Sequence, residues 1–472
     1  MLAPGPGGRA AGQSADLAAE SERAKAAMAD GRLDEAIQIY TRLVEALPTN
    51  AGLQMNLGMA RLMAGAPGDA LEPLRKATAL DSSLMPAWLF LGAANLDLGR
   101  SDAAIAPLRK VVAAEPRNAQ ARQMLGQALL ATHRYDDAAA QFEQSTIEGP
   151  SAARAWYGIA RSYEALARDA YEQLRKAAPD SAWELLLVAD VLVTDQKPEE
   201  ALELYRDALA RVPDVPGVHE TVAALYDHAG RSELAAEARR QAAATVPDCQ
   251  VKRAECAFLE KRFKNALALL GTRTDASALY WRARACNELA TGAFARLEQL
   301  PPSSELRLVQ AELLQARGQR LEAVDVLRDG LKLDSSRRDV KLALVSALVA
   351  ARNAGEALPL AKELLLLAPD DPKLLYLYGE SLAQTQHLDR AIPLLERAAR
   401  RRPDLMPARV SLGRALVQSG RAADAIPHLV AASATDEDGS TWYQLAQAYQ
   451  QTGQPDQARK ALDEYRKRQR TP

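Results

Sequence analysis

The chain has 472 residues, of which 48% are hydrophobic and only 5% aromatic, and its formal net charge is -2. A nearly neutral chain has no strong general attraction for nucleic acid or for an anionic membrane surface. No run of apolar residues is long enough to predict a membrane-spanning helix.

Residues 1–16 show no repeat pattern, and we expect a flexible N-terminal segment there. This segment has no apolar stretch of the kind found in a signal peptide, so the sequence as written indicates a cytoplasmic protein. Ala10, Ala11 and Gly12 have the small side chains of a cleavage site, however. Export to the periplasm or beyond therefore stays open if translation starts upstream of Met1. The alanine-, leucine- and arginine-rich composition is typical of a bacterial protein.

From residue 17 onward the main feature is a recurring alanine. Inside each run of units, neighbouring alanines lie 34 residues apart, except at the last step, which is 33. They are Ala36, Ala70, Ala104, Ala138, Ala201, Ala235, Ala323, Ala357, Ala391, Ala425 and Ala458. A fixed period of this length is typical of stacked helical units, because no unit can bury its apolar face alone. The sequence therefore predicts an all-α solenoid over residues 17–472, with no second domain.

The unit from Met85 to Asn118 shows the pattern of one repeat. Two amphipathic helical stretches flank a turn at Gly99, and the small residues Gly92 and Ala104 allow the two helices to cross closely. This pattern resembles the tetratricopeptide repeat, W-x2-L-G-x2-Y followed by A, F, A and P within 34 residues. The Leu-Gly element recurs at Leu57–Gly58, Leu91–Gly92, Leu125–Gly126 and Leu412–Gly413, and as Tyr378–Gly379. The resemblance implies a right-handed superhelical solenoid of about 14 helix-turn-helix units.

Eleven full units are predicted, and three degenerate units fill the gaps between them. The degenerate units lie near 153–181, 250–275 and 276–303. The first and the last of these align with each other without gaps, and both lack several residues around the turn inside the repeat. We expect each shortened unit to change the twist of the superhelix locally.

The three cysteines, Cys249, Cys256 and Cys286, do not predict a disulfide framework or a zinc site. Cys249 and Cys256 could pair only if Cys249 precedes the helix that carries Cys256, since one continuous helix would hold them about 10 Å apart. Buried free thiols are the favoured interpretation, and the disulfide is the alternative.

No catalytic or metal-binding constellation is found in the sequence. The five histidines fall in four units, and His219 and His228 lie on opposite faces of their helix. No metalloprotease, phosphate-loop or nucleophile-elbow motif occurs. We therefore predict no enzymatic activity, no metal and no cofactor.

Binding of a protein or peptide is the predicted function. The resemblance implies that the first helices line a concave groove, through the second, fifth, ninth and twelfth positions of each unit. The candidate contacts at those positions are Met55, Met59, Tyr157, Arg161, Tyr280, Arg284, Tyr376, Glu380, Arg414 and Tyr443. Tyrosine and arginine are common in binding hot spots, and methionine adapts to varied apolar side chains. The alternatives are a solvated Tyr–Arg pair on one helix face and methionines covered by the superhelix itself.

Two other functions compete with this prediction. An open-ended solenoid could stack head to tail into an oligomer or filament, although the polar last helix and the atypical first unit argue against it. A strip of arginines and tyrosines could follow single-stranded nucleic acid, a minor hypothesis for a near-neutral chain. The arginines at 400–402 and 337–338 end second helices, where positive charge favours the helix dipole.

Overall fold

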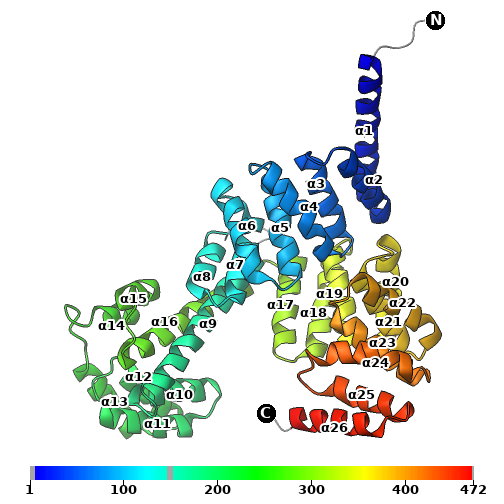
Figure 1. The fold of residues 1–472 in the computed structure, drawn as a ribbon. Helices are drawn as coiled ribbons and strands as arrows, with labels where there is room; N and C mark the ends of the chain where they lie inside the picture. The colour runs from blue at the N-terminus through cyan, green and yellow to red at the C-terminus, as the bar shows by residue number, and fades with distance from the viewer. Residues whose placement is uncertain (1–5, 146–151, 470–472) are drawn as a thin grey trace, which may run out of the picture. The chain divides into compact units, whose positions relative to one another are not determined.

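The computed structural model describes residues 6–145 and 152–469, which form 26 α-helices and no strand (Figure 1). Helix contacts divide the chain into two compact units. Unit 1 comprises Met1–Met124 and Pro302–Pro472, and unit 2 comprises Leu125–Pro301. Unit 2 is therefore inserted in the sequence between the two segments of unit 1, and α7 (Ala119–Ala131) crosses the first boundary.

The first segment of unit 1 is a series of three helix pairs. The helices are α1 (Pro6–Ala29), α2 (Leu33–Ala46), α3 (Ala51–Met63), α4 (Pro67–Leu80), α5 (Met85–Asp97) and α6 (Ser101–Ala114). Helix α1 begins at Pro6 and so covers most of the segment for which the sequence predicted no repeat. Residues 1–5 lie outside the described part of the chain.

The second segment of unit 1 contains five helix pairs in regular succession. The helices are α17 (Ser304–Ala316), α18 (Arg320–Leu333), α19 (Arg338–Ala350), α20 (Ala354–Leu367), α21 (Pro372–Gln384), α22 (Leu388–Arg401), α23 (Met406–Gln418), α24 (Ala422–Ser433), α25 (Ser440–Gln451) and α26 (Pro455–Gln469). One apolar core runs through all of these pairs. The two segments of unit 1 contact each other, since Arg401 of the second segment pairs with Asp34 of the first at 3.1 Å. Arg401 also pairs with Asp370 of its own segment at 2.8 Å.

Unit 2 is less regular than either segment of unit 1. After α7 its helices are α8 (Tyr135–Glu143), α9 (Ala152–Ala177), α10 (Ala182–Thr194), α11 (Pro198–Arg211), α12 (Val218–His228), α13 (Ser232–Ala244), α14 (Arg253–Leu259), α15 (Phe263–Leu270) and α16 (Ala276–Glu298). Its core is centred on the aromatic side chains Tyr205, Tyr280 and Trp281, all of which are almost completely buried.

The 34-residue period corresponds to close crossing of the two helices of a pair. Of the eleven recurring alanines, ten have no exposed surface and the last, Ala458, is 3% exposed. A Cβ atom added at Gly92 would lie 2.6 Å from the side chain of Leu108 on the second helix of its pair. A side chain larger than that of Gly92 or of a recurring alanine would push the two helices of the pair apart, which explains why small residues recur at these positions.

Each turn within a pair contains one residue in the left-handed backbone region. Glycine, which adopts this conformation without strain, occupies it in seven turns, including those at Gly31, Gly65 and Gly99. A residue with a side chain occupies it in five turns, at His133, Gln196, Lys261, Arg352 and Gln386.

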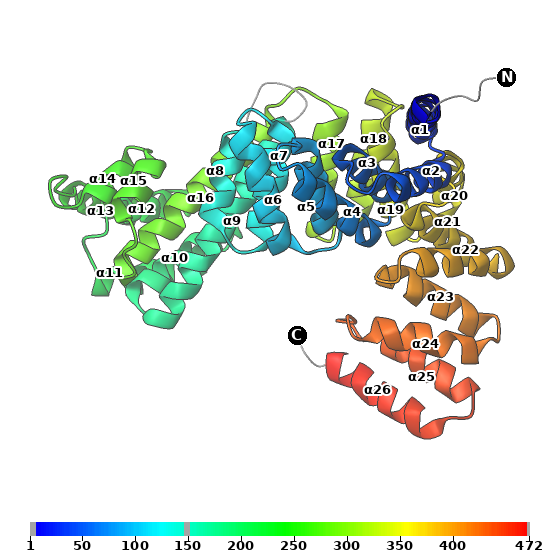
Figure 2. The same ribbon diagram turned by 45° about the horizontal axis from the view of Figure 1, so that its top comes forward.

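Helices α9 and α16 are single continuous helices, where the sequence predicted shortened helix-turn-helix units near 153–181 and 276–303. Both lack the turn residue with positive φ that ends the first helix of every pair, so nothing interrupts the helix. The two helices pack against each other along their lengths and lie side by side in both views (Figures 1 and 2). The third degenerate unit, near 250–275, is a short pair formed by α14 and α15.

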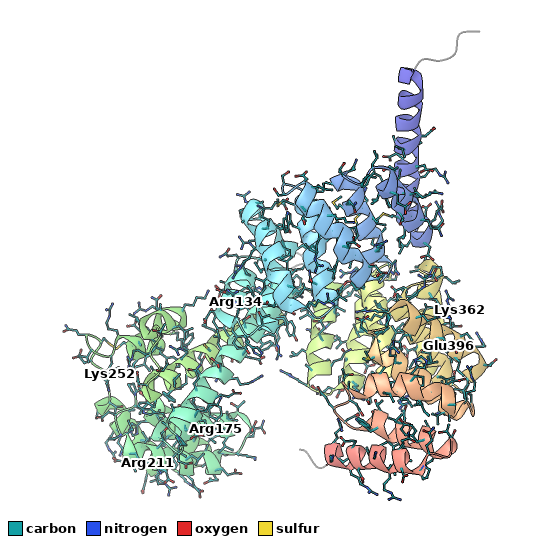
Figure 3. All side chains as sticks on the ribbon, in the orientation of Figure 1. Arg134, Arg175, Arg211, Lys252, Lys362 and Glu396 are labelled. Carbon is teal, nitrogen blue, oxygen red and sulfur yellow. A yellow bond between two sulfur atoms is a disulfide. The ribbon has the colours of Figure 1, made fainter. Side chains whose placement is uncertain are left out.

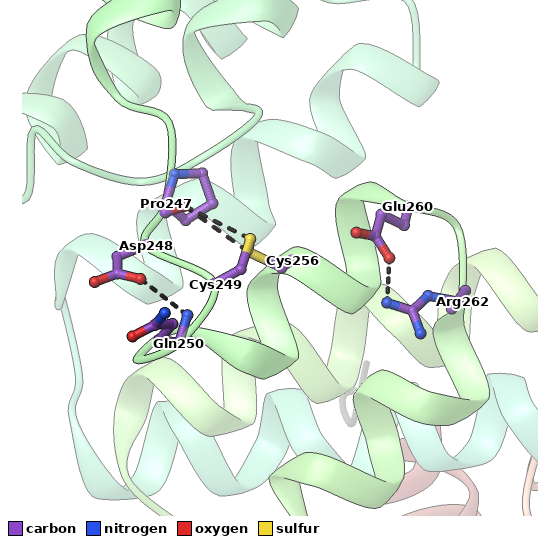
Figure 4. Close-up of a disulfide and its surroundings, with 7 residues drawn as sticks. All are labelled: Pro247, Asp248, Cys249, Gln250, Cys256, Glu260 and Arg262. Atoms are coloured by element: carbon purple, nitrogen blue, oxygen red, sulfur yellow. Dashed lines mark hydrogen bonds and ion pairs between the residues drawn. A yellow bond between two sulfur atoms is a disulfide. The ribbon is translucent and has the colours of Figure 1, made fainter.

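The favoured interpretation of Cys249 and Cys256 as free thiols was wrong, because the two residues form a disulfide (Figure 4). Cys249 precedes α14, which carries Cys256, and this was the condition under which the pair could form. Cys286 is a buried free cysteine.

Candidate functional site

A groove of about 560 Å³ opens along three successive first helices of unit 1, α19, α21 and α23. Its wall on α21 contains Lys373, Tyr376 and Glu380, which hold the second, fifth and ninth positions of their repeat. Arg414 holds the ninth position of the next repeat and lines the groove from α23. The structure therefore brings together three residues that the sequence predicted as contacts, Tyr376, Glu380 and Arg414.

The floor of the groove is a hydrogen-bonded cluster. Glu380 is 4% exposed, and both of its carboxylate oxygens accept hydrogen bonds from the guanidinium of Arg414. The side-chain amide of Gln384 donates to Glu380 at 2.9 Å and to the Val349 carbonyl at 3.1 Å. Burial raises the pKa of the neighbouring Tyr376 to about 12, so its phenol stays protonated at neutral pH and can donate a hydrogen bond.

One polar atom of this cluster has no partner among the described residues. The side-chain oxygen of Gln384 is buried and accepts no hydrogen bond. A buried acceptor without a donor costs free energy. Because this oxygen is covered, a ligand could reach it only if neighbouring side chains moved.

Positive charge predominates along the rim of the groove. Arg320, Arg352 and Lys373 are exposed, and no acidic side chain in the described part of the chain forms an ion pair with them. Glu380, the one acidic residue that lines the groove, is already paired with Arg414. The residues that line the groove therefore carry a local surplus of three positive charges on a protein whose total charge is close to zero.

The predicted contacts Tyr280 and Arg284 lie in the core of unit 2. Tyr280 has no exposed surface and accepts a 2.9 Å hydrogen bond from Arg284. The Arg284 guanidinium also pairs with Asp190 at 3.3 Å and stacks on three aromatic rings, the nearest being Phe258 at 4.9 Å. Tyr205 completes the cluster by donating to Asp190 at 2.5 Å. This network joins α16 to α10, α11 and α14.

The remaining predicted contacts are dispersed over the molecule. Tyr157 and Arg161 lie half-buried on α9, and Arg161 pairs with Glu164 at 3.0 Å on the same helix. Met55 and Met59 are half-buried on α3, where each packs against a neighbouring apolar cluster. Tyr443 on α25 is 46% exposed, with its ring 5.5 Å from that of Tyr465.

Sequence reasoning missed several residues that line the groove. Lys373 holds the second position of its repeat, which was expected to line the groove, so the sequence contained the information needed to predict it. Arg320 and Arg352 lie beside turns, outside the expected positions, and only the spatial arrangement of neighbouring repeats places them on the rim.

Part of each basic cluster considered for nucleic-acid binding is engaged within the protein. Arg337 pairs with Glu305 at 2.7 Å and with Asp339. Arg402 donates to the Asp97 carbonyl at 2.9 Å, and Arg401 pairs with two aspartates. Charged side chains are spread over the surfaces of both units, as the labelled Arg175, Arg211 and Lys362 illustrate (Figure 3).

Two further features of the described residues bear on function. No group of three or more histidine, cysteine, aspartate or glutamate residues in this part of the chain could hold a metal ion. None of the helices in residues 6–145 and 152–469 has both the length and the apolar character required to cross a membrane.

Comparison with known proteins gives one consistent family. Models described as tetratricopeptide repeat match residues 21–84, 95–162, 165–216, 186–248, 348–415, 382–444 and 416–472, which together cover well over half of the chain. A search of curated protein sequences finds no match.

Solved structures that resemble the chain are also repeat proteins. The crystal structure of the MamA protein is 25% identical, covers 41% of this chain and 90% of its own, and has a TM-score of 0.30. A thermophilic tetratricopeptide repeat protein of Thermus thermophilus is 18% identical, with coverages of 36% and 92% and a TM-score of 0.32. YrrB, described as a repeat protein with an unusual peptide-binding site, is 21% identical, with coverages of 38% and 92% and a TM-score of 0.28.

Proposed function

Because this chain belongs to the tetratricopeptide repeat family, we propose that it is a non-enzymatic scaffold that binds an extended segment of another protein. The binding site is the groove of α19, α21 and α23, lined by Tyr376, Glu380 and Arg414. Stacked repeats present long open surfaces rather than closed reaction chambers, and this architecture suits recognition of an extended chain.

The main observation that supports the proposal is the surplus of positive charge along this groove. Arg320, Arg352 and Lys373 form no ion pair with a carboxylate of the described residues, although the protein has slightly more acidic than basic side chains. Asp97 lies near enough to Lys373 for the two charges to attract, but it does not line the groove. Three like charges on one rim repel each other, and an acidic ligand would relieve that repulsion. The partner segment should therefore carry aspartate or glutamate side chains facing the rim.

The floor of the groove supplies the uncharged part of the recognition. The protonated phenol of Tyr376 donates a hydrogen bond to a backbone carbonyl of the ligand. Glu380 holds Arg414 in place across two repeats, so its guanidinium is positioned before the ligand arrives. Side chains that are held in position lose less entropy on binding.

A peptide titration tests this assignment. The probe is a fluorescent twelve-residue peptide of alternating glutamate and serine with an amidated end, compared with the same peptide carrying glutamine in place of glutamate. The glutamate peptide should bind, and Lys373→Gln combined with Arg352→Gln should weaken it by about tenfold or more for the loss of two charged contacts. Affinity should also fall as the salt concentration rises.

A matched control uses a cation outside the groove. Lys362 is exposed on α20 and does not line the groove, so Lys362→Gln should leave the affinity unchanged. Equal binding of the glutamate and glutamine peptides, or equal losses in the control and the groove variant, would refute the acidic-peptide assignment.

Self-association is the competing function, and one measurement separates it from the scaffold. Light scattering across a concentration series should give a constant mass of 51.0 kDa for a monomeric scaffold. A mass that grows with concentration, together with loss of growth in the Lys373→Gln and Arg352→Gln variant, would assign the groove to contacts between copies.

A further inference from the structure

Unit 2 contains a helix pair that is poorly supported by its neighbours. In regular parts of the chain, each second helix packs along the first helix of the next pair, as α4 does on α5 and α20 on α21. In unit 2, α11 touches α12 at only a few positions, and α13 hardly touches α14. The pair formed by α12 and α13 therefore contacts its neighbours less than other pairs do, and its link to them is the part that Val218 and Val222 take in the core of unit 2.

A disulfide bond lies in the region where α13 and α14 make few contacts with each other. The segment from Thr245 to Lys252 connects α13 to α14, and the disulfide joins its exposed Cys249 to the buried Cys256 in α14 (Figure 4). The segment has little packing of its own, since Val246 and Val251 are each 77% exposed. Inside the segment, Lys252 donates to the Asp248 carbonyl at 2.7 Å, and the disulfide is the side-chain bond that joins the segment to α14.

The same helix pair forms one wall of an open groove. This groove, of about 620 Å³, lies between α11, α12 and α13 and is lined by apolar side chains that include Leu209, Val222 and Leu234. Its lining continues through Ala244 and Thr245, which lead directly into the disulfide segment. The position of the end of α13 therefore sets the width of the groove.

We propose that the Cys249–Cys256 disulfide is a redox-sensitive latch that fixes the α12–α13 pair and thereby the groove beside it. With the bond closed, the segment that follows α13 is tied to α14, which limits how far the end of α13 can move, and the groove keeps its shape. With the bond open, the pair keeps its part of the apolar core and its few contacts with α11 but loses its covalent restraint, and it separates from α11 and α14 more readily. This inference concerns unit 2 and is independent of the peptide groove in α19, α21 and α23.

A dithiol reductant opens the latch in two balanced steps. One of its thiolates attacks the sulfur of the exposed Cys249, and the disulfide breaks with Cys256 leaving as a thiolate. The second thiol of the reductant then displaces Cys249, and the reductant becomes a disulfide. Two electrons have passed to the protein, and Cys249 and Cys256 each end with one proton.

Hydrogen exchange measured by mass spectrometry tests the latch on the full chain, with and without dithiothreitol. Reduction should make backbone amides of α12 and α13 exchange about tenfold faster, while those of α9, α16 and α17–α26 stay unchanged. The double variant Cys249→Ser and Cys256→Ala should exchange at the fast rate with or without reductant, which separates the latch from any effect of dithiothreitol on Cys286.

Three outcomes would overturn the proposal. Unchanged exchange of α12 and α13 on reduction would show that the disulfide does not hold the pair. Faster exchange throughout unit 2 would make the bond a general staple of the fold rather than a latch. Titration of three free thiols in the air-oxidised protein would show that the bond does not form.

Discussion

The regular array of α17–α26 and the irregular unit 2 treat similar side chains in different ways. In the array, Tyr376 and Arg414 line an open groove formed by consecutive first helices. In unit 2, Tyr280 and Arg284 are enclosed by α10, α11 and α14, because the single helix α16 takes the place of a helix pair. A tyrosine and an arginine at these repeat positions line an open groove in the array, where the neighbouring pairs keep regular spacing, and are enclosed in unit 2.

This difference separates charges that are paired inside the fold from charges that are exposed in the groove. Arg284 is surrounded by rings and paired with Asp190, so its charge is used inside the protein. Lys373 and Arg352 form no such ion pair with the described residues and face the groove. Substitutions in the two regions should therefore have different effects, and the largest effect is expected in unit 2.

Arg284→Met should destabilise unit 2 by about 3 kcal/mol, the scale found when one partner of a buried ion pair is removed. The variant leaves Asp190 without its cation and removes the stacking on Phe258. Hydrogen exchange of α10, α11 and α16 should report the loss. Lys373→Gln is the matched control and should leave stability unchanged, so equal stability of the two variants would contradict the division.

A second comparison concerns the glycine at a helix crossing. A Cβ at Gly158 of α9 would overlap the ring of Phe142, which is rigid and also packs on Gly126, whereas a Cβ at Gly413 would lie 2.5 Å from the flexible Leu429. Gly158→Ala should therefore cost about 2–3 kcal/mol and Gly413→Ala about 1 kcal/mol. Urea unfolding of both variants measures the difference, and a larger loss for Gly413→Ala would show that the crossing in α9 is not the tighter one.

The third comparison measures stability and peptide affinity separately for a substitution at a single residue. Arg352 adopts a φ of 61° in the turn after α19, a conformation that glycine adopts with less strain. Arg352→Gly should raise stability by about 0.5–1 kcal/mol while it weakens the acidic peptide. Gln386→Gly, at the equivalent turn with a φ of 64°, should give the same gain without loss of affinity. Loss of affinity in both variants would indicate that the turn backbone, rather than the charge, matters for binding.

These contrasts also show which parts of the molecule the sequence could predict. The period of 34 residues predicted the helix pairs, because the buried alanines, and the glycine found at some of the crossings, are local requirements of two packed helices. The same register placed Tyr376, Glu380 and Arg414 beside each other, since successive repeats stack in register. Where the repeat is regular, the position of a residue within its unit therefore predicts which residues of the neighbouring units lie beside it.

Predictions made from the repeat register failed in the part of the chain where the regular repeat is interrupted. The fusion of each shortened unit into one helix, α9 and α16, depends on the absence of a turn residue, and the packing of these two helices joins segments more than a hundred residues apart. No local pattern encodes that contact, so Tyr280 and Arg284 were assigned to a surface. The disulfide was likewise undecided, because it depends on where α14 begins.

The smallest expected effect is a pH dependence confined to the regular array. His428 on α24 is half-buried, and its Nδ1 has no hydrogen-bond partner among the described residues. Burial lowers the pKa of His428, and the charge of Arg409 lowers it further, against the opposing effect of Glu396 and Asp424. In the unfolded chain the imidazole takes up a proton near pH 6.5, before it does so in the folded protein.

The sign of the effect follows from this order of protonation. Well above pH 6.5 the imidazole is neutral in both states, and its contribution to stability is fully present. As the pH falls from about 6.5 toward the lowered pKa of the folded state, the unfolded state binds the proton first and that contribution is lost. His428→Gln, which is neutral throughout, should show a smaller loss of stability between pH 7.5 and 5.5 than the wild type. Hydrogen exchange corrected for pH should place the difference in α23–α25, and a difference confined to unit 2 would mean that another group is responsible.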